Sequence, residues 1–168
     1  MMEARLPVAV TSSLALHGGF IAAYLYMAQA NAVHQARVIG NVDLLIQDDR
    51  SRTLLTWRDD EFFGAGWHLP GGIIRYKETA AERIRACARE ELGADVASDA
   101  APLLVVETIR RQATRGHFIS LLFRCRLISL PDPAKRAATD TPVAGQWRWH
   151  QRCPPDLPVV QRPYAPFF

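Results

Sequence analysis

The chain has 168 residues, of which 49% are hydrophobic and 22% are charged, with a formal net charge of +3. These values are typical of one soluble globular domain and exclude a disordered or low-complexity chain. The slight positive charge comes mostly from arginine, and without a dense basic run it does not indicate nucleic-acid binding. The three cysteines, Cys87, Cys125 and Cys153, contain no CxxC pair. Neither a zinc site nor a disulfide framework is therefore predicted, and a reducing compartment fits best.

The first 36 residues form an apolar leader, and residues 37–168 are the expected folded domain. No charged residue occurs between Arg5 and Arg37, and residues 6–30 are mostly apolar. The run ends in Ala28-Gln29-Ala30, which resembles a secretory cleavage site, and it also resembles a short membrane anchor. Two glycines and several polar residues interrupt it. We therefore expect a cytoplasmic protein, with export or anchoring through residues 6–30 as the alternative.

Beyond the leader, apolar runs alternate with polar turns. Strands are predicted at residues 42–46, 53–57, 73–74, 103–109, 118–128 and 146–150, with one helix from about 79 to 92. The first two strands, separated by a short polar segment, are expected to pair as a hairpin. The proline-rich tail is expected to be irregular. Strands, then a helix, then strands again predict an α+β fold with a mixed sheet.

The predicted helix is marked at both ends. Thr79 and Glu82 form a capping box, and Gly93 is placed for a left-handed C-cap. Helical spacing gives an apolar stripe of Ala80, Ala81, Ile84, Ala88 and Leu92. The same spacing puts Cys87, Glu90 and Glu91 together at one edge of that stripe. Arg85, Arg89 and Glu82 fall on the opposite, solvent-facing arc.

Two carboxylates at the rim of a buried stripe, close to a Gly-Gly turn, suit a hard divalent cation. Such a cation prefers oxygen ligands and keeps waters that a diphosphate can replace. It would neutralise phosphate charge and orient a water molecule. Without this context, adjacent glutamates on a helix are usually a solvated face.

The stretch from Gly71 to Val96 resembles the Nudix box: G, five residues, E, seven residues, R-E, an apolar residue, any residue, E-E, any residue, G. The matching positions are Gly72, Glu78, Glu90, Glu91 and Gly93. The preceding Trp67-His68-Leu69-Pro70-Gly71-Gly72 is also similar to the family's usual lead-in. The resemblance covers about residues 40–150 and implies the Nudix fold, a mixed β-sheet sandwiched between helices.

One departure from the family pattern bears on function. The R-E pair of the box is Ala86-Cys87 here, so an arginine and a carboxylate are missing. GDP-mannose mannosyl hydrolases also lack this glutamate, but they carry a Gln-His pair just before an Arg-Trp. No such pair precedes Arg148-Trp149, so that branch's catalytic base is absent as well.

The resemblance implies an enzyme that hydrolyses a nucleoside diphosphate linked to another moiety, with Mg²⁺ or Mn²⁺ as cofactor. A nucleotide sugar similar to GDP-mannose is the favoured substrate. An ADP-ribose-type pyrophosphatase and a domain that binds a nucleotide without turnover are the alternatives. The expected partner is this small molecule, without nucleic acid; a membrane contact would depend on the leader, and a homodimer is left open.

The resemblance also assigns the candidate site residues. Glu90 and Glu91 would bind the metal and serve catalysis, Gly72 would add its carbonyl, and Glu78 would be a ligand or hold the loop. Arg58 is expected to contact phosphate, and Gly71 and Gly72 are the other expected ligand-binding residues. His117 is a candidate base or a surface residue. His68 is expected to be structural, and Trp147 and Trp149 are expected to pack on the sheet.

Overall fold

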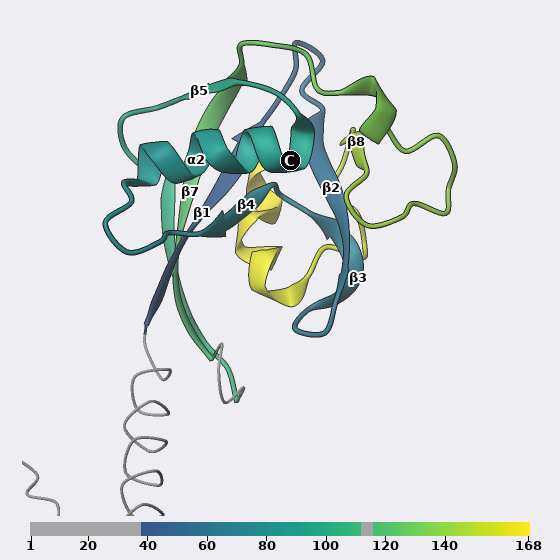
Figure 1. Ribbon diagram of the computed structural model, residues 1–168. Coiled ribbons are helices and arrows are strands. Elements are labelled where there is room, and N and C mark those ends of the chain that lie inside the picture. Colours follow the sequence, from purple (N-terminus) through teal and green to yellow (C-terminus); the bar gives the residue numbers. More distant parts are fainter. Residues whose placement is uncertain (1–37, 112–115) are drawn as a thin grey trace, which may run out of the picture. The chain divides into compact units, whose positions relative to one another are not determined.

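The computed structural model describes residues 38–111 and 116–168, which contain two β-sheets and a few short helices (Figure 1). The first sheet has the order β4 (Gly71–Ile73), β1 (Ile39–Ile46), β7 (His117–Leu127), β5 (Val96–Ser98), and β6 (Leu104–Ile109) also pairs with β7. The second has the order β3 (Gly64–His68), β2 (Thr53–Asp60), β8 (Trp147–His150). Because β1 and β7 run parallel and the other pairs antiparallel, the first sheet is mixed. The predicted α+β class with a mixed sheet is confirmed.

Strand β1 positions both the core and the site, because its side chains alternate between the two faces of the sheet. Val42, Leu44 and Ile46 join the core cluster that also holds the buried side chains of the helix predicted at about residues 79–92, called the box helix below. Asp43 and Leu45 point the other way, where they meet the C-terminal 3-10 helix η3 (Val159–Phe167). The first sheet therefore lies between helical segments on its two faces (Figure 1).

The box helix begins as predicted but ends differently. Helix α2 (Ala80–Cys87) starts with the Thr79–Glu82 capping box, and Gly93 ends the helical segment with φ 64°. Between them, η1 (Ala88–Leu92) is a π-helix. Its wider turn changes the direction of the side chains that follow Cys87, including Glu90 and Glu91.

The core-facing side of the helix is partly as predicted. Ile84, Ala88 and Leu92 are buried, whereas Ala81 is exposed. The stripe was wrong at Ala81 because the helix packs on β1, β4 and β5. This packing turns the side that carries Arg83, rather than Ala81, toward the sheet.

The predicted hairpin of the first two strands was wrong. A turn held by Asp48, which accepts the backbone N–H groups of Arg50 and Arg52, does join β1 to β2. Beyond one isolated bridge, Gln47 to Thr53, the strands separate into different sheets. Strand β1 lies between β4 and β7, and β2 lies between β3 and β8, so both edges of each strand are paired with strands other than its predicted partner. Local turn chemistry predicts a reversal of the chain but not which neighbour completes the sheet.

The tail also differs from the prediction, since it forms η3 with Tyr164 fully buried. Strands β3 and β5 were not predicted. Trp147 is buried and Trp149 packs against the core, as expected. The leader, residues 1–36, lies outside the described residues. In the described part of the chain, no helix has the length and apolar character needed to cross a membrane.

Candidate active site

Glu91 is the centre of the hydrogen bonding around the box. Its Oε2 accepts the hydroxyl of Thr56 at 2.7 Å, and its Oε1 accepts Nη2 of Arg58 at 2.6 Å and the backbone N–H of Gly71 at 2.9 Å. Nη2 of Arg58 also donates to the Gly71 carbonyl at 2.8 Å. One carboxylate therefore joins three segments that are distant in sequence: β2, the Gly-Gly turn and the box helix.

Glu90 and Glu78 lie around a second arginine, Arg83, that the sequence analysis did not single out. Its side chain is 4% exposed. Nη2 of Arg83 donates to Oε2 of Glu90 at 2.8 Å, and its Nε lies 3.9 Å from Oε1 of Glu78. Glu78 also accepts the backbone N–H of Arg75 and so holds the loop before the helix. The predicted loop-holding contact of Glu78 is therefore present.

The two glycines of the turn allow close approach. A Cβ on Gly71 would lie 2.3 Å from the backbone oxygen of Val42, and a Cβ on Gly72 would lie 2.9 Å from Sγ of Cys87. Neither distance is compatible with a side chain unless the neighbour moves. The sequence therefore needs glycine here so that β4 can lie against both β1 and the helix.

A pocket opens beside this turn, with about 690 Å³ of empty space that includes its open mouth. Arg58, Gly71 and Gly72 line it, together with an aromatic pair, Phe63 and Phe118, whose ring centroids are 6.3 Å apart. The remaining lining residues are Asn41, Asp43, Asp60, His68, Ile73, Thr108, Ser120, Val160 and Gln161.

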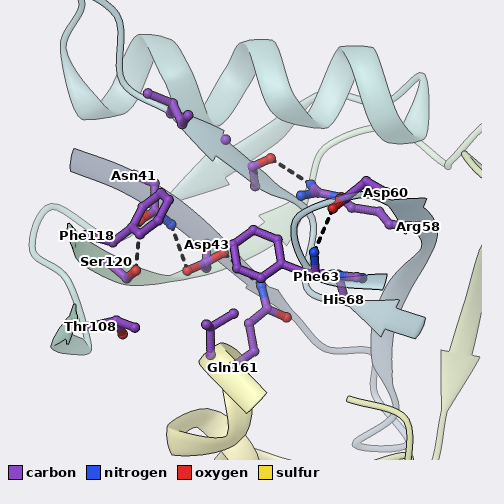
Figure 2. A pocket seen from close by; sticks show the side chains of 14 residues that line it. Asn41, Asp43, Arg58, Asp60, Phe63, His68, Thr108, Phe118, Ser120 and Gln161 are labelled. Atoms are coloured by element: carbon purple, nitrogen blue, oxygen red, sulfur yellow. Dashed lines mark hydrogen bonds between the residues drawn. The ribbon is translucent and has the colours of Figure 1, made fainter. Parts of the chain in front are cut away.

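Asp43 is a buried carboxyl group of this pocket (Figure 2). It accepts the hydroxyl of Tyr164 at 2.7 Å and the side-chain amides of Gln161 at 3.0 Å and Asn41 at 3.1 Å. The Asn41 carbonyl in turn accepts the hydroxyl of Ser120. Burial raises the pKa of Asp43 to about 6, although these donors and the charge of Arg58 oppose the rise.

This shift predicts how stability depends on pH. Asp43 ionises near pH 3.8 when unfolded and near 6 when folded, so its contribution is fully present below pH 3.8 and is lost as pH rises through 6. We expect the stability of the wild type relative to Asp43→Asn to fall by up to about 3 kcal/mol across this window and to be constant above it. Denaturant unfolding of both proteins between pH 4 and pH 7 measures this difference. A difference that does not change with pH would contradict the prediction.

The histidines have separate roles. His68 is buried, its Nδ1 lies 2.9 Å from the Gly66 carbonyl, and burial lowers its pKa to about 4. It is therefore neutral near pH 7, in keeping with a structural role, although it borders the pocket. His117 is not among the pocket-lining residues, and its Nε2 lies 2.9 Å from a carboxylate oxygen of Glu107. Its neighbour Phe118 lines the pocket instead.

The predicted metal ligands do not fit a divalent ion as they are arranged here. Glu91 accepts three hydrogen bonds, and Glu90 is paired with Arg83. In the place of the missing family carboxylate, Cys87 has a pKa that burial raises to about 11, so its thiol is neutral. Among residues 38–111 and 116–168, no group of three or more His, Cys, Asp or Glu side chains is placed to hold a metal ion. We therefore assign no catalytic step to a metal.

The comparisons with known proteins agree with this fold. The NUDIX domain model matches residues 39–155, and the chain therefore belongs to the Nudix family of hydrolases. No curated protein matches the sequence.

Solved structures with the same fold include several Nudix proteins. A MutT NUDIX hydrolase from Burkholderia pseudomallei is 23% identical, with a TM-score of 0.58 over 77% of this chain and 97% of that one. A MutT protein from Methanosarcina mazei Go1 is 18% identical, with a TM-score of 0.57 over 77% and 89%. A UDP-X diphosphatase is 21% identical, with a TM-score of 0.51 over 68% and 51%. At these identities the likeness establishes the fold alone.

Proposed function

We propose that the pocket binds a nucleoside diphosphate linked to another moiety and that the domain hydrolyses this compound. A nucleotide sugar similar to GDP-mannose is the substrate that the sequence favours. The observation that carries the proposal is the position of Arg58, which lines the pocket and is fixed by Glu91 and the Gly71 carbonyl. A fixed guanidinium suits the planar, bidentate recognition of phosphate oxygens.

The other pocket residues support a nucleotide. Phe63 and Phe118 offer aromatic surface on which a base can stack. Asp43 and Gln161 place polar groups deeper in the same pocket, where they can distinguish bases or sugars by hydrogen bonds. A UDP-X diphosphatase is among the structures that share the fold.

A second candidate, binding of such a ligand without turnover, is favoured by a specific observation. Glu90 and Glu91 are both paired with arginines, and the third carboxylate of the family box is a thiol here. Carboxylates held in these pairs are less available to orient a water molecule. The two candidates share a ligand class and differ in whether a bond is broken.

Turnover by the purified full-length chain decides between them. A panel of GDP- and UDP-sugars, ADP-ribose, NADH and nucleoside triphosphates is incubated with Mg²⁺, with Mn²⁺ or with EDTA, and products are identified by mass spectrometry. We expect a nucleoside mono- or diphosphate to be released from one class. A ligand that raises the melting temperature but stays intact would support binding alone. Neither turnover nor a thermal shift with any compound would overturn both candidates.

A substitution in the aromatic pair tests whether the ligand binds in this pocket. Phe63→Ala removes one ring of the aromatic pair, and we expect it to weaken binding of the active compound about tenfold, as loss of one stacking contact does. Tyr76→Ala is the control, since Tyr76 is 91% exposed and is not among the pocket-lining residues. Binding constants for both variants come from isothermal titration. An equal effect of the two substitutions would place the ligand elsewhere.

A further inference from the structure

Arg83 is a buried cation in the part of the box where a metal was expected. Its guanidinium lies between two carboxylates of the box, 2.8 Å from Glu90 through Nη2 and 3.9 Å from Glu78 through Nε. The Nε atom is buried and has no hydrogen-bond partner among the described residues. Both carboxylates therefore face a positive charge that belongs to the chain itself.

The side chain of Arg83 lies close to Gly72 of the Gly-Gly turn. A Cβ on Gly72 would lie 2.9 Å from Sγ of Cys87 and 3.8 Å from Nε of Arg83. Arg83, Cys87 and Gly72 thus meet at one point, beside Glu90. The box pattern assigns Gly72 and Glu90 to a metal. The space next to these two residues is filled by the thiol of Cys87 and the guanidinium of Arg83.

The charges around this point are already balanced. Glu90 and Glu78 face Arg83, Glu91 is paired with Arg58, and the guanidinium of Arg75 lies 4.0 Å from Glu90. A divalent ion placed here would be repelled by the arginines, and its carboxylate ligands would first have to give up their present partners.

We propose that Arg83 is the resident cation of this site, in place of a divalent metal. The guanidinium holds Glu78 and Glu90 together and so fixes the turn that borders the pocket. The inference concerns the site of the proposed function, but it holds whichever ligand the pocket takes. It predicts that the folded wild-type chain has no saturable site for Mg²⁺ or Mn²⁺ and is not stabilised by either ion.

Titration with Mn²⁺ alone tests this, because free Mn²⁺ gives an electron paramagnetic resonance signal that is lost on binding. We expect wild-type protein to leave the Mn²⁺ signal unchanged. Arg83→Met removes the charge and keeps an apolar stem, and we expect it to gain one saturable Mn²⁺ site, at least about tenfold tighter than any nonspecific association of Mn²⁺ with the wild type. The ion should also raise the melting temperature of Arg83→Met and leave that of the wild type unchanged.

Two further variants make the result specific. Arg85→Met is the matched control, since Arg85 is on the same helix and exposed, and it should resemble the wild type. Adding Glu90→Gln to Arg83→Met should abolish the gained Mn²⁺ site. Saturable Mn²⁺ binding by the wild type that Glu90→Gln removes would overturn the proposal, and this measurement stands even if Arg83→Met fails to fold. A folded Arg83→Met protein that binds no Mn²⁺ would overturn it too.

The same titrations separate this inference from the proposed function. They contain no nucleotide, so an inactive substrate panel leaves their outcome unaffected. Conversely, turnover that requires Mg²⁺, in a wild-type chain that binds Mn²⁺ at Glu90, would support hydrolysis and contradict the role of Arg83.

Discussion

Replacing Gly71 with alanine should destabilise the domain by about 3 kcal/mol or more, the upper range for forcing extra atoms into a packed interior. The added Cβ would lie 2.3 Å from the Val42 oxygen, 2.8 Å from Oδ1 of Asp43 and 3.1 Å from its Cα. Two of these three atoms belong to the backbone of the central strand β1, which cannot rotate away. The turn would have to shift, and with it the Gly71 N–H and carbonyl that contact Glu91 and Arg58.

The neighbouring strand offers a matched control for this substitution. Gly40 lies in β1, and a Cβ there would meet Cδ1 of Ile74 at 3.8 Å, an ordinary van der Waals contact. Gly40→Ala should therefore leave the free energy of unfolding unchanged or raise it slightly, because alanine restricts the unfolded chain. Denaturant unfolding of the two variants beside the wild type gives the comparison. Equal stabilities of Gly71→Ala and Gly40→Ala would contradict the close approach at the turn.

The sequence predicts the box helix and the turn well because their signals are local. The Thr79–Glu82 cap, Gly93 and the buried positions Ile84 and Leu92 follow from spacing within one segment. The structure places Gly71, Gly72 and Arg58 at one pocket, and the sequence grouped the same three residues through the family pattern.

The burial of Arg83 could not be predicted from helical spacing alone. On the predicted helix it falls between Glu90 and Cys87, so its direction was available from the spacing. A long arginine side chain at the edge of an apolar stripe can extend into solvent or fold inward, and burial is decided by the strand beneath the helix. Here the lack of a side chain on Gly72 leaves that space. A charged residue at the carboxylate edge of the helix was the signal that could have identified Arg83.

The hydrogen bonds around Asp43 in the pocket could not have been predicted in this way. Asp43 is 118 positions from Gln161 and 121 from Tyr164, yet both donate to its carboxylate. Strand alternation indicates that Asp43 points away from Val42 and Leu44, but not what it meets. The proline-rich tail gives no periodic pattern from which its fold or its contact with β1 could be derived.

Replacing Glu91 with glutamine should affect stability and activity together, because one carboxylate binds three donors. Glutamine keeps a single acceptor oxygen, and its NH₂ group cannot accept a hydrogen bond from Thr56 or Arg58. The loss of charge also leaves Arg58, whose side chain is 32% exposed, without its ionic partner. We expect a destabilisation of about 2 kcal/mol, below the range for a fully buried pair because both groups retain some exposure.

If Arg58 binds phosphate, turnover or ligand affinity should fall by at least about tenfold, since a displaced guanidinium loses its bidentate contact. Unfolding curves and the substrate panel measure the two effects. Glu107→Gln is the control, since its carboxylate is 61% exposed and pairs with His117, and its stability should change by less than about 0.5 kcal/mol. A Glu91→Gln protein as stable as this control would mean that Glu91 does not hold β2, the Gly-Gly turn and the box helix together. A stable but inactive one would assign Glu91 to the chemistry alone.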